Sequence, residues 1–107
     1  MLDKLTIQDI VSQIKIFEPK QVILFGSQAL GCATQDSDVD LLVVKDIPEN
    51  TVRQLRLQIK EALWTNLKFL HTEFDVIVDS EERILKRIEL GDLFYKEIYT
   101  NGIILYA

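Results

Sequence analysis

The amino-acid sequence predicts a layered α/β domain in which a small sheet is covered by helices. Short apolar runs of strand length alternate with longer stretches of helical periodicity along the chain. The composition is 48% hydrophobic and 27% charged, which is typical of a globular protein. The 107 residues fit one domain, so we expect residues 1–107 to fold as a single unit.

The first half of the chain contains two predicted helical segments and two predicted strands. Residues 6–17 carry isoleucines at helical spacing, and Thr6 is the predicted cap of that helix. The apolar run 21–25 indicates a buried strand, because it is short and nearly continuous. A short helical piece is expected at 28–31, and a second strand at 38–44.

The second half repeats the alternation of helix and strand. A long helix is predicted over 51–69, followed by a strand at 74–78 and a helix at 80–90 that begins with a suitable capping serine. A last helix at 92–100 and a short strand at 103–106 complete the pattern. Sequence leaves open which strands run parallel. The buried stripe of the long helix is predicted to consist of Val52, Leu55, Ile59, Leu63 and Leu67.

The charge and cysteine content limit the possible functions and settings. Twelve basic and 17 acidic residues give a net charge of −5, which argues against direct binding of DNA or RNA. A single nucleotide is still compatible, since a bound metal ion can supply positive charge. Cys32 is the only cysteine, and neither a leader nor a membrane span is visible, so we expect a reducing, cytoplasmic setting.

Gly26 and Ser27 follow the first predicted strand directly and suggest a binding site for phosphate. Glycine has no Cβ, so the backbone can take a positive φ and approach a ligand closely. Backbone amides exposed after a strand bind phosphate oxygens, and the serine hydroxyl adds a compact donor. By itself the pair would most often be only a tight turn.

Three aspartates supply the candidate metal ligands and catalytic groups. Asp38 and Asp40 are two residues apart on extended backbone, so both project from one face. Asp75 is the only charge in the otherwise apolar run 74–78, where an unpaired carboxylate is costly. If the two strands are neighbours, the three carboxylates could hold one or two Mg²⁺ ions, and Asp75 could act as a base. The nearby Asp36 is interpreted as solvated.

These residues together resemble the DNA polymerase β-type nucleotidyltransferase superfamily. The pattern is Gly26-Ser27, ten further residues, Asp38-x-Asp40, and a later aspartate on a strand. The string GSQALGCATQDSDVDLLVV is similar to the minimal nucleotidyltransferases of prokaryotes, and the resemblance extends from about residue 21 to 78. It implies a mixed sheet of about four strands flanked by helices. It also implies metal ligation by Asp38 and Asp40, with Asp75 as the third catalytic carboxylate.

The resemblance further implies a toxin–antitoxin context. Minimal members often pair with a small helical partner of the HEPN type, and some transfer AMP from ATP onto a tyrosine of that partner. The leading hypothesis is therefore a Mg²⁺-dependent enzyme that moves AMP from ATP, or another nucleoside triphosphate, to a protein hydroxyl. Homo-oligomers are also compatible with the sequence.

One departure from the family pattern favours a second hypothesis. Many relatives carry two arginines after the Gly-Ser pair, where this chain has Gln28 and Leu30. Neither residue can clamp triphosphate oxygens as arginine does. The alternative is therefore a weak or inactive antitoxin that neutralises its partner by contact. A third reading, adenylylation of a small molecule, usually requires an added substrate domain.

Several other conspicuous residues are assigned structural roles. Trp64 is expected in the core or an interface, and Arg83 on a solvated helix face together with its acidic neighbours. Phe94, Tyr95 and Tyr99 recur at helical spacing and are expected mostly in the core. An aromatic stripe on a small domain can also form a partner surface.

Overall fold

The structure is a computed structural model that describes residues 2–34, 37–69 and 71–107, so Asp36 lies outside the described residues. Helices and strands alternate as the sequence predicts. The elements are, in chain order, α1 (Lys4–Lys15), β1 (Gln21–Phe25), α2 (Ser27–Leu30), β2 (Val39–Val44), a 3₁₀ turn (Glu49–Thr51), α3 (Val52–Trp64), a second 3₁₀ turn (Leu67–Phe69), β3 (Phe74–Asp79), α4 (Glu81–Glu89), α5 (Leu93–Asn101) and β4 (Ile103–Tyr106).

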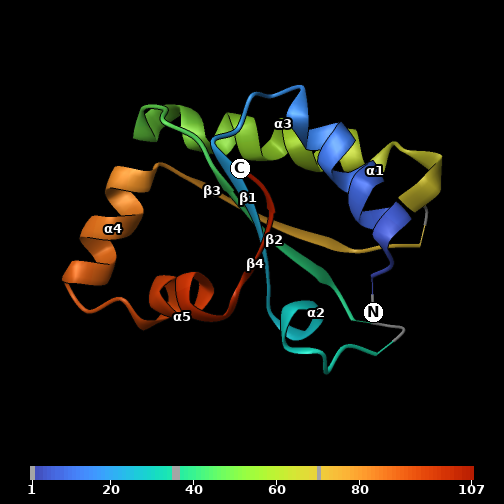
Figure 1. Cartoon of the computed structure of the whole chain (residues 1–107). Coiled ribbons are helices and arrows are strands. Elements are labelled where there is room, and N and C mark those ends of the chain that lie inside the picture. The colour runs from blue at the N-terminus through green and yellow to red at the C-terminus, as the bar shows by residue number, and fades with distance from the viewer. Residues whose placement is uncertain (1, 35–36, 70) are drawn as a thin grey trace.

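The four strands form one mixed sheet in the order β3-β2-β1-β4 (Figure 1). Strand β1 runs antiparallel to both of its neighbours, β2 and β4. Strands β2 and β3 are parallel, and such a pair needs a long crossover, which α3 supplies. The mixed four-stranded sheet confirms the fold class implied by the family resemblance.

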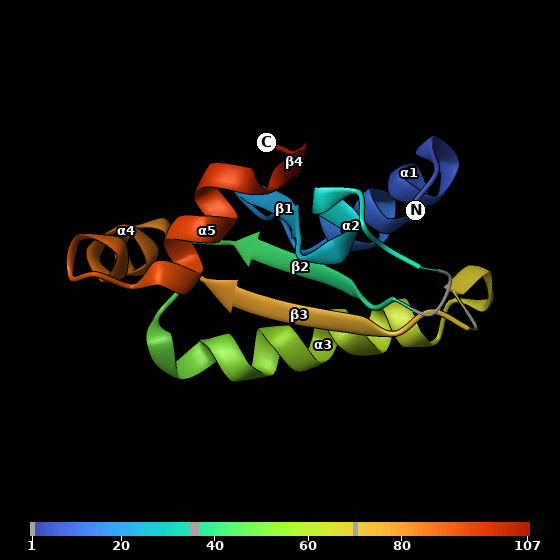
Figure 2. The same cartoon turned by 90° about the horizontal axis from the view of Figure 1, so that it is seen from below.

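Helices cover both faces of the sheet, with α1 and α3 on one face and α4 and α5 on the other (Figure 1 and Figure 2). Two hydrophobic core clusters lie on the two faces of the sheet. Because successive strand residues point to opposite faces, Leu41 of β2 belongs to the first cluster and Leu42 to the second. The first cluster joins Leu41 to α1 and α3 through Ile10 and Ile59. The second joins Leu42 to α4 and α5, and it defines the face that carries the candidate site.

The first helix begins earlier than the sequence predicts, and Thr6 is not its cap. Asp3 precedes the helix in an extended conformation, and its carboxylate accepts a hydrogen bond of 2.7 Å from the Thr6 backbone amide. An aspartate three residues upstream satisfies an exposed helix donor in the way a cap does. Thr6 therefore lies inside the first turn of α1, and the predicted cap is wrong by three positions.

The long helix ends at Trp64, five residues before the predicted end. The Thr65 hydroxyl donates to the Glu61 carbonyl at 2.8 Å, and the Asn66 side chain accepts from the Lys68 amide at 2.9 Å. Side-chain hydrogen bonds of this kind compete with continued helix. Leu67 consequently lies beyond α3. Trp64 is 78% exposed, which excludes a core position in this chain.

Candidate active site

Gly26 stands at the junction of β1 and α2 in a conformation that favours glycine. Its backbone has φ 72° and ψ −152°, and α2 begins at the next residue, Ser27. A Cβ atom at this position would overlap the carboxylate of Asp40. The glycine is therefore required twice, once for the turn and once for the close approach of the Asp40 side chain.

The strand register brings the predicted aspartates to the same end of the sheet. Asp40 pairs with Phe25 on β1 and with Asp75 on β3. Because laterally paired residues in a sheet point to the same face, Asp40 and Asp75 share one face, and Asp38 lies two residues before Asp40. The structure therefore places Asp40 and Asp75 side by side, with Asp40 against Gly26, and Asp38 is near enough for its charge to act on Asp40.

The electrostatics of the cluster favour a cation. Asp38 and Asp75 are exposed, whereas Asp40 is half-buried. Burial raises the pKa of Asp40 above its usual value, and the negative charges of Asp75 and Asp38 raise it further. A nearby divalent cation would oppose both causes, since it favours the ionised carboxylate.

The donor set fits magnesium, although the ligands are not preassembled. Carboxylate oxygens are the ligands that Mg²⁺ prefers, and exposed side chains leave positions for water and phosphate. Across residues 2–34, 37–69 and 71–107, no group of three acidic, histidine or cysteine side chains already stands as a metal site.

Helix α2 supplies the other half of the candidate site. The backbone amides of Ser27 and Gln28 donate no hydrogen bond to any described residue, so they remain open to a ligand. The Gln28 side chain is 6% exposed, and its Oε1 has no partner within the described part of the chain. Leu30 is 59% exposed. Neither side chain brings a positive charge to the triphosphate position.

The cavity beside Gly26 is too small to enclose a nucleotide. It has a volume of about 60 Å³ and is lined partly by Gly26, Leu30 and Glu97. Enclosed ligand sites usually measure about 300–1,000 Å³. Asp38, Asp40 and Asp75 do not line this cavity, and Asp38 and Asp75 are exposed, so a ligand of these aspartates would lie outside it.

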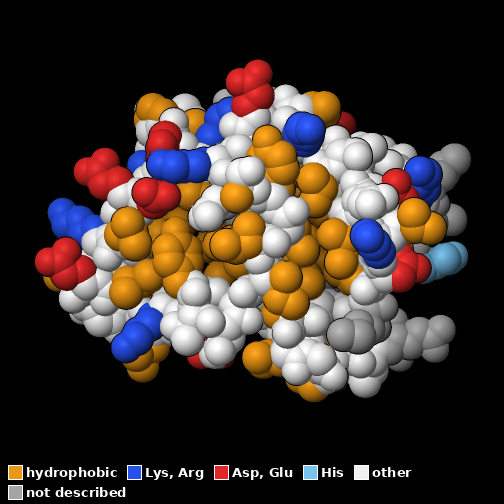
Figure 3. Space-filling view, viewed as in Figure 1, with side chains coloured by type: hydrophobic (Ala, Val, Ile, Leu, Met, Phe, Trp, Pro, Cys, Tyr) orange, Lys and Arg blue, Asp and Glu red, His pale blue; other side chains and the backbone are white. Residues whose placement is uncertain are grey.

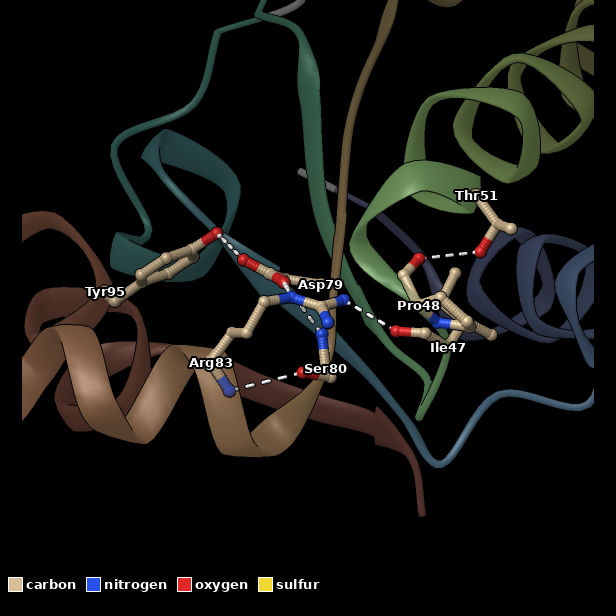
Figure 4. Close-up of polar contacts among 7 residues, drawn as sticks. All are labelled: Ile47, Pro48, Thr51, Asp79, Ser80, Arg83 and Tyr95. Carbon is tan, nitrogen blue, oxygen red and sulfur yellow. Dashed lines mark hydrogen bonds and ion pairs between the residues drawn. The ribbon is translucent and has the colours of Figure 1, made fainter.

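The far end of β3 carries a polar network that the sequence analysis misses (Figure 4). Asp79 accepts hydrogen bonds from Arg83 Nε at 2.6 Å, the Ser80 amide at 2.9 Å and the Tyr95 hydroxyl at 2.9 Å. Burial, and then the contact with Asp79, raises the pKa of Tyr95. The predicted solvated role of Arg83 is wrong, and the four-residue spacing of Asp79 and Arg83 was the available signal.

The chain is similar to a known domain family and to an individual relative. The profile of the nucleotidyltransferase domain family matches residues 6–105. A protein of Methanocaldococcus jannaschii named "Putative protein adenylyltransferase" is 35% identical over 89 residues, covering 81% of this chain and 78% of the relative. The chain therefore belongs to the nucleotidyltransferase domain family, and the resemblance inferred from its motifs is confirmed.

Solved structures share the fold at low sequence identity. A toxin–antitoxin crystal structure with AMP-PNP has a TM-score of 0.57 at 18% identity, covering 94% of this chain and 73% of the other. A second toxin–antitoxin crystal structure, of a mutant in which two aspartates two positions apart are replaced by glutamate, has a TM-score of 0.54 at 16% identity. That match covers 99% of this chain and 74% of the other. Among the described residues, no helix has the length and apolar character needed to cross a membrane.

Proposed function

We propose that this nucleotidyltransferase transfers AMP from ATP to a hydroxyl group of a partner protein, with Mg²⁺ held by Asp38, Asp40 and Asp75. The observation that carries the proposal is the register of the sheet, which pairs Asp40 with Asp75 beside Gly26. The raised pKa of Asp40 adds support, because the cluster has excess negative charge that a cation would offset.

The residues of the chain have distinct roles in this reaction. Gly26 lets the triphosphate approach the backbone, and the open amides of Ser27 and Gln28 donate to its oxygens. Bound magnesium supplies charge neutralisation for the triphosphate and the departing pyrophosphate. Asp75 accepts the proton of the acceptor hydroxyl, whose oxygen bonds to the α-phosphorus as the bond to pyrophosphate breaks.

A protein acceptor is favoured over a small molecule for two reasons. The relative from Methanocaldococcus jannaschii is named as a protein adenylyltransferase, and it matches over most of both chains. Asp38 and Asp75 are also exposed, so a side chain of another protein can reach them. Because both solved neighbours are toxin–antitoxin structures, we propose that this chain is an antitoxin with a HEPN-type helical partner.

Incubation with ATP, Mg²⁺ and the purified partner tests the reaction. Mass spectrometry should show that the partner gains one adenylyl group, and that Asp38→Asn abolishes the gain. Asp46→Asn is the matched control, since Asp46 is an exposed aspartate whose ion pair with Lys20 lies at the other end of β2. Equal modification by wild type and Asp38→Asn would contradict the proposal.

Two observations keep contact-only neutralisation as a second candidate function. Gln28 and Leu30 bring no charge to the triphosphate position, which would weaken nucleotide binding. Apolar side chains also gather across the face that carries β4 and α5 (Figure 3), including the exposed Leu93, Phe94 and Ile104. Under this alternative, a variant with both Asp38→Asn and Asp40→Asn would still protect cells from the partner. Under the catalytic proposal, protection would be lost.

A further inference from the structure

A groove runs along the open edge of β3, at the opposite end from Asp75. It has a volume of about 490 Å³, and Ile77, Val78 and Asp79 of β3 lie along its floor. Residues from the start of α3 and from α4 form its two walls. Strand β3 pairs only with β2 in the described sheet, so this side of the strand is an edge. The groove is thus separate from the candidate active site.

The groove is positively charged, although the chain as a whole is negative. Five basic residues and two acidic ones line the groove, so the formal charge of the lining is +3. The acidic residues are Glu49 and Asp79. The whole chain carries −5. The positive potential is therefore local to this surface. The five basic residues of the lining are Arg53, Arg56, Arg83, Lys86 and Arg87.

Three of the five cations have no acidic partner. Arg83 is paired with Asp79, and Arg87 with Asp92. In the part of the chain that the structure describes, no ion pair includes the exposed Arg53, Arg56 or Lys86. These three come from both walls, so their charges face the same groove from two directions.

The walls are held in place by the network around Asp79. Arg83 donates to Asp79 and, through Nη2, to the carbonyl of Ile47 at 2.8 Å, which ties α4 to the segment leading into α3 (Figure 4). The Tyr95 hydroxyl donates to the other oxygen of Asp79 and connects α5 to the same point. The groove is therefore preformed, which reduces the ordering that a ligand must impose.

We propose that this groove binds an acidic segment of a partner protein. Its carboxylates would face Arg53, Arg56 and Lys86, and an apolar side chain would pack against Leu90, which lines the groove and is 77% exposed. Charge complementarity selects such a segment. RNA fits less well, since no aromatic side chain lines the groove for base stacking and the rest of the chain repels a polyanion.

The cations also have a simpler explanation. Charged side chains along a sheet edge discourage pairing with other strands, and that role needs no ligand. The two explanations differ in whether an acidic peptide binds at this surface. The proposal does not depend on nucleotide transfer, so the two can fail separately.

A labelled, glutamate-rich peptide of about a dozen residues with two leucines is the probe. Amide NMR should show shifts gathered at α3, α4 and Ile77, and fluorescence anisotropy should give the affinity. A variant with Arg53→Glu, Arg56→Glu and Lys86→Glu should bind at least about tenfold more weakly at physiological salt, where charges beyond roughly 8 Å are screened. The Mg²⁺–ATP thermal shift of this variant should match wild type, which shows that the fold and candidate active site are intact.

A second triple variant controls for net charge. Lys4→Glu, Lys60→Glu and Lys96→Glu change the charge equally at exposed positions outside the groove, and should alter affinity by about twofold or less. Equal weakening in both variants, or no peptide binding, overturns the proposal. Tighter binding of an RNA oligonucleotide of matched charge also overturns it. The proposal is also overturned if sedimentation shows that the groove variant breaks a homodimer, because the groove is then occupied by a second copy of this chain.

Discussion

Asp75 and Asp79 lie on the same strand, four residues apart and on the same face, yet their surroundings are opposite. The carboxylate of Asp79 is 13% exposed and accepts hydrogen bonds from Arg83, Ser80 and Tyr95. Asp75 is exposed, and its described neighbours Asp40 and Asp38 carry the same charge. The protein itself satisfies Asp79, whereas Asp75 has no hydrogen-bond partner among the described residues and is a proposed ligand of the metal ion.

The contrast shows how one residue type serves stability or chemistry according to its partners. A buried carboxylate with a full set of donors fixes the elements that supply those donors, here α4 and α5. A carboxylate that faces like charges raises the energy of the folded state, and a cation relieves it. Strand β3 thus has an anchored end at Asp79 and, under the proposed function, a reactive end at Asp75, and the following substitutions test that division.

The largest effect is expected for Asp75→Asn. Transfer activity should fall by about 10³-fold, equivalent to about 4 kcal/mol, because a metal ligand and the proposed base are both removed. The melting temperature should not fall, since Asp75 has no hydrogen bond or ion pair among the described residues and its charge repels Asp40. Single-turnover transfer and circular dichroism measure the two quantities. A large loss of stability with activity retained would reverse the assignment of the two ends.

Asp79→Ala should instead reduce stability. Removing the carboxylate leaves the Arg83 guanidinium and the Tyr95 hydroxyl without their partner, which costs about 3 kcal/mol. For a domain of this size, that lowers the melting temperature by roughly 10 °C or more. Asp46→Ala, which breaks an exposed ion pair, should cost about 0.5 kcal/mol or less. Equal effects of the two substitutions would show that the network contributes little.

Gly26→Ala is expected to act on the reactive end. The new methyl group would meet the Asp40 carboxylate, and alanine disfavours a φ of 72°. We expect a loss of about 2 kcal/mol in stability and a fall in activity of about 10²-fold, since Asp40 must move. Gly31→Ala is the control, because that glycine also has positive φ but open space around it. It should lose stability with little change in activity.

The smallest effect is a gain of stability in Asp40→Asn. The folded state raises the pKa of Asp40, so the folded protein holds that proton more tightly than the unfolded chain. Stability therefore falls as pH rises from the ordinary value of 3.8 to the raised folded value, and the loss persists at higher pH. Asparagine removes this loss, so without metal the melting temperature at neutral pH should rise by about 2–4 °C. An unchanged pH profile would contradict the raised pKa of Asp40, which burial and the charges of Asp75 and Asp38 cause.

The sequence indicated the residues of the candidate site more completely than it indicated the hydrogen-bond network around Asp79. Asp38 and Asp40 could be placed together because extended backbone brings alternate residues to one face, and Gly26 because it ends an apolar strand. The pairing of Asp40 with Asp75 could not be derived, since a parallel register depends on a crossover with no local signal. The role of Arg83 depends on the Ile47 carbonyl, 36 positions away, and no periodic pattern records such a contact.

The crossover that pairs β2 with β3 has a consequence for proteolysis. Two of the three candidate ligands, Asp38 and Asp40, precede α3, and the third, Asp75, follows it on β3. A single cut near the exposed His71 would divide the acidic cluster between two fragments without altering either group of residues. Recovery of transfer after mixing the fragments would then report that the β2–β3 ladder had reassembled, which makes the chain a candidate for a split reporter.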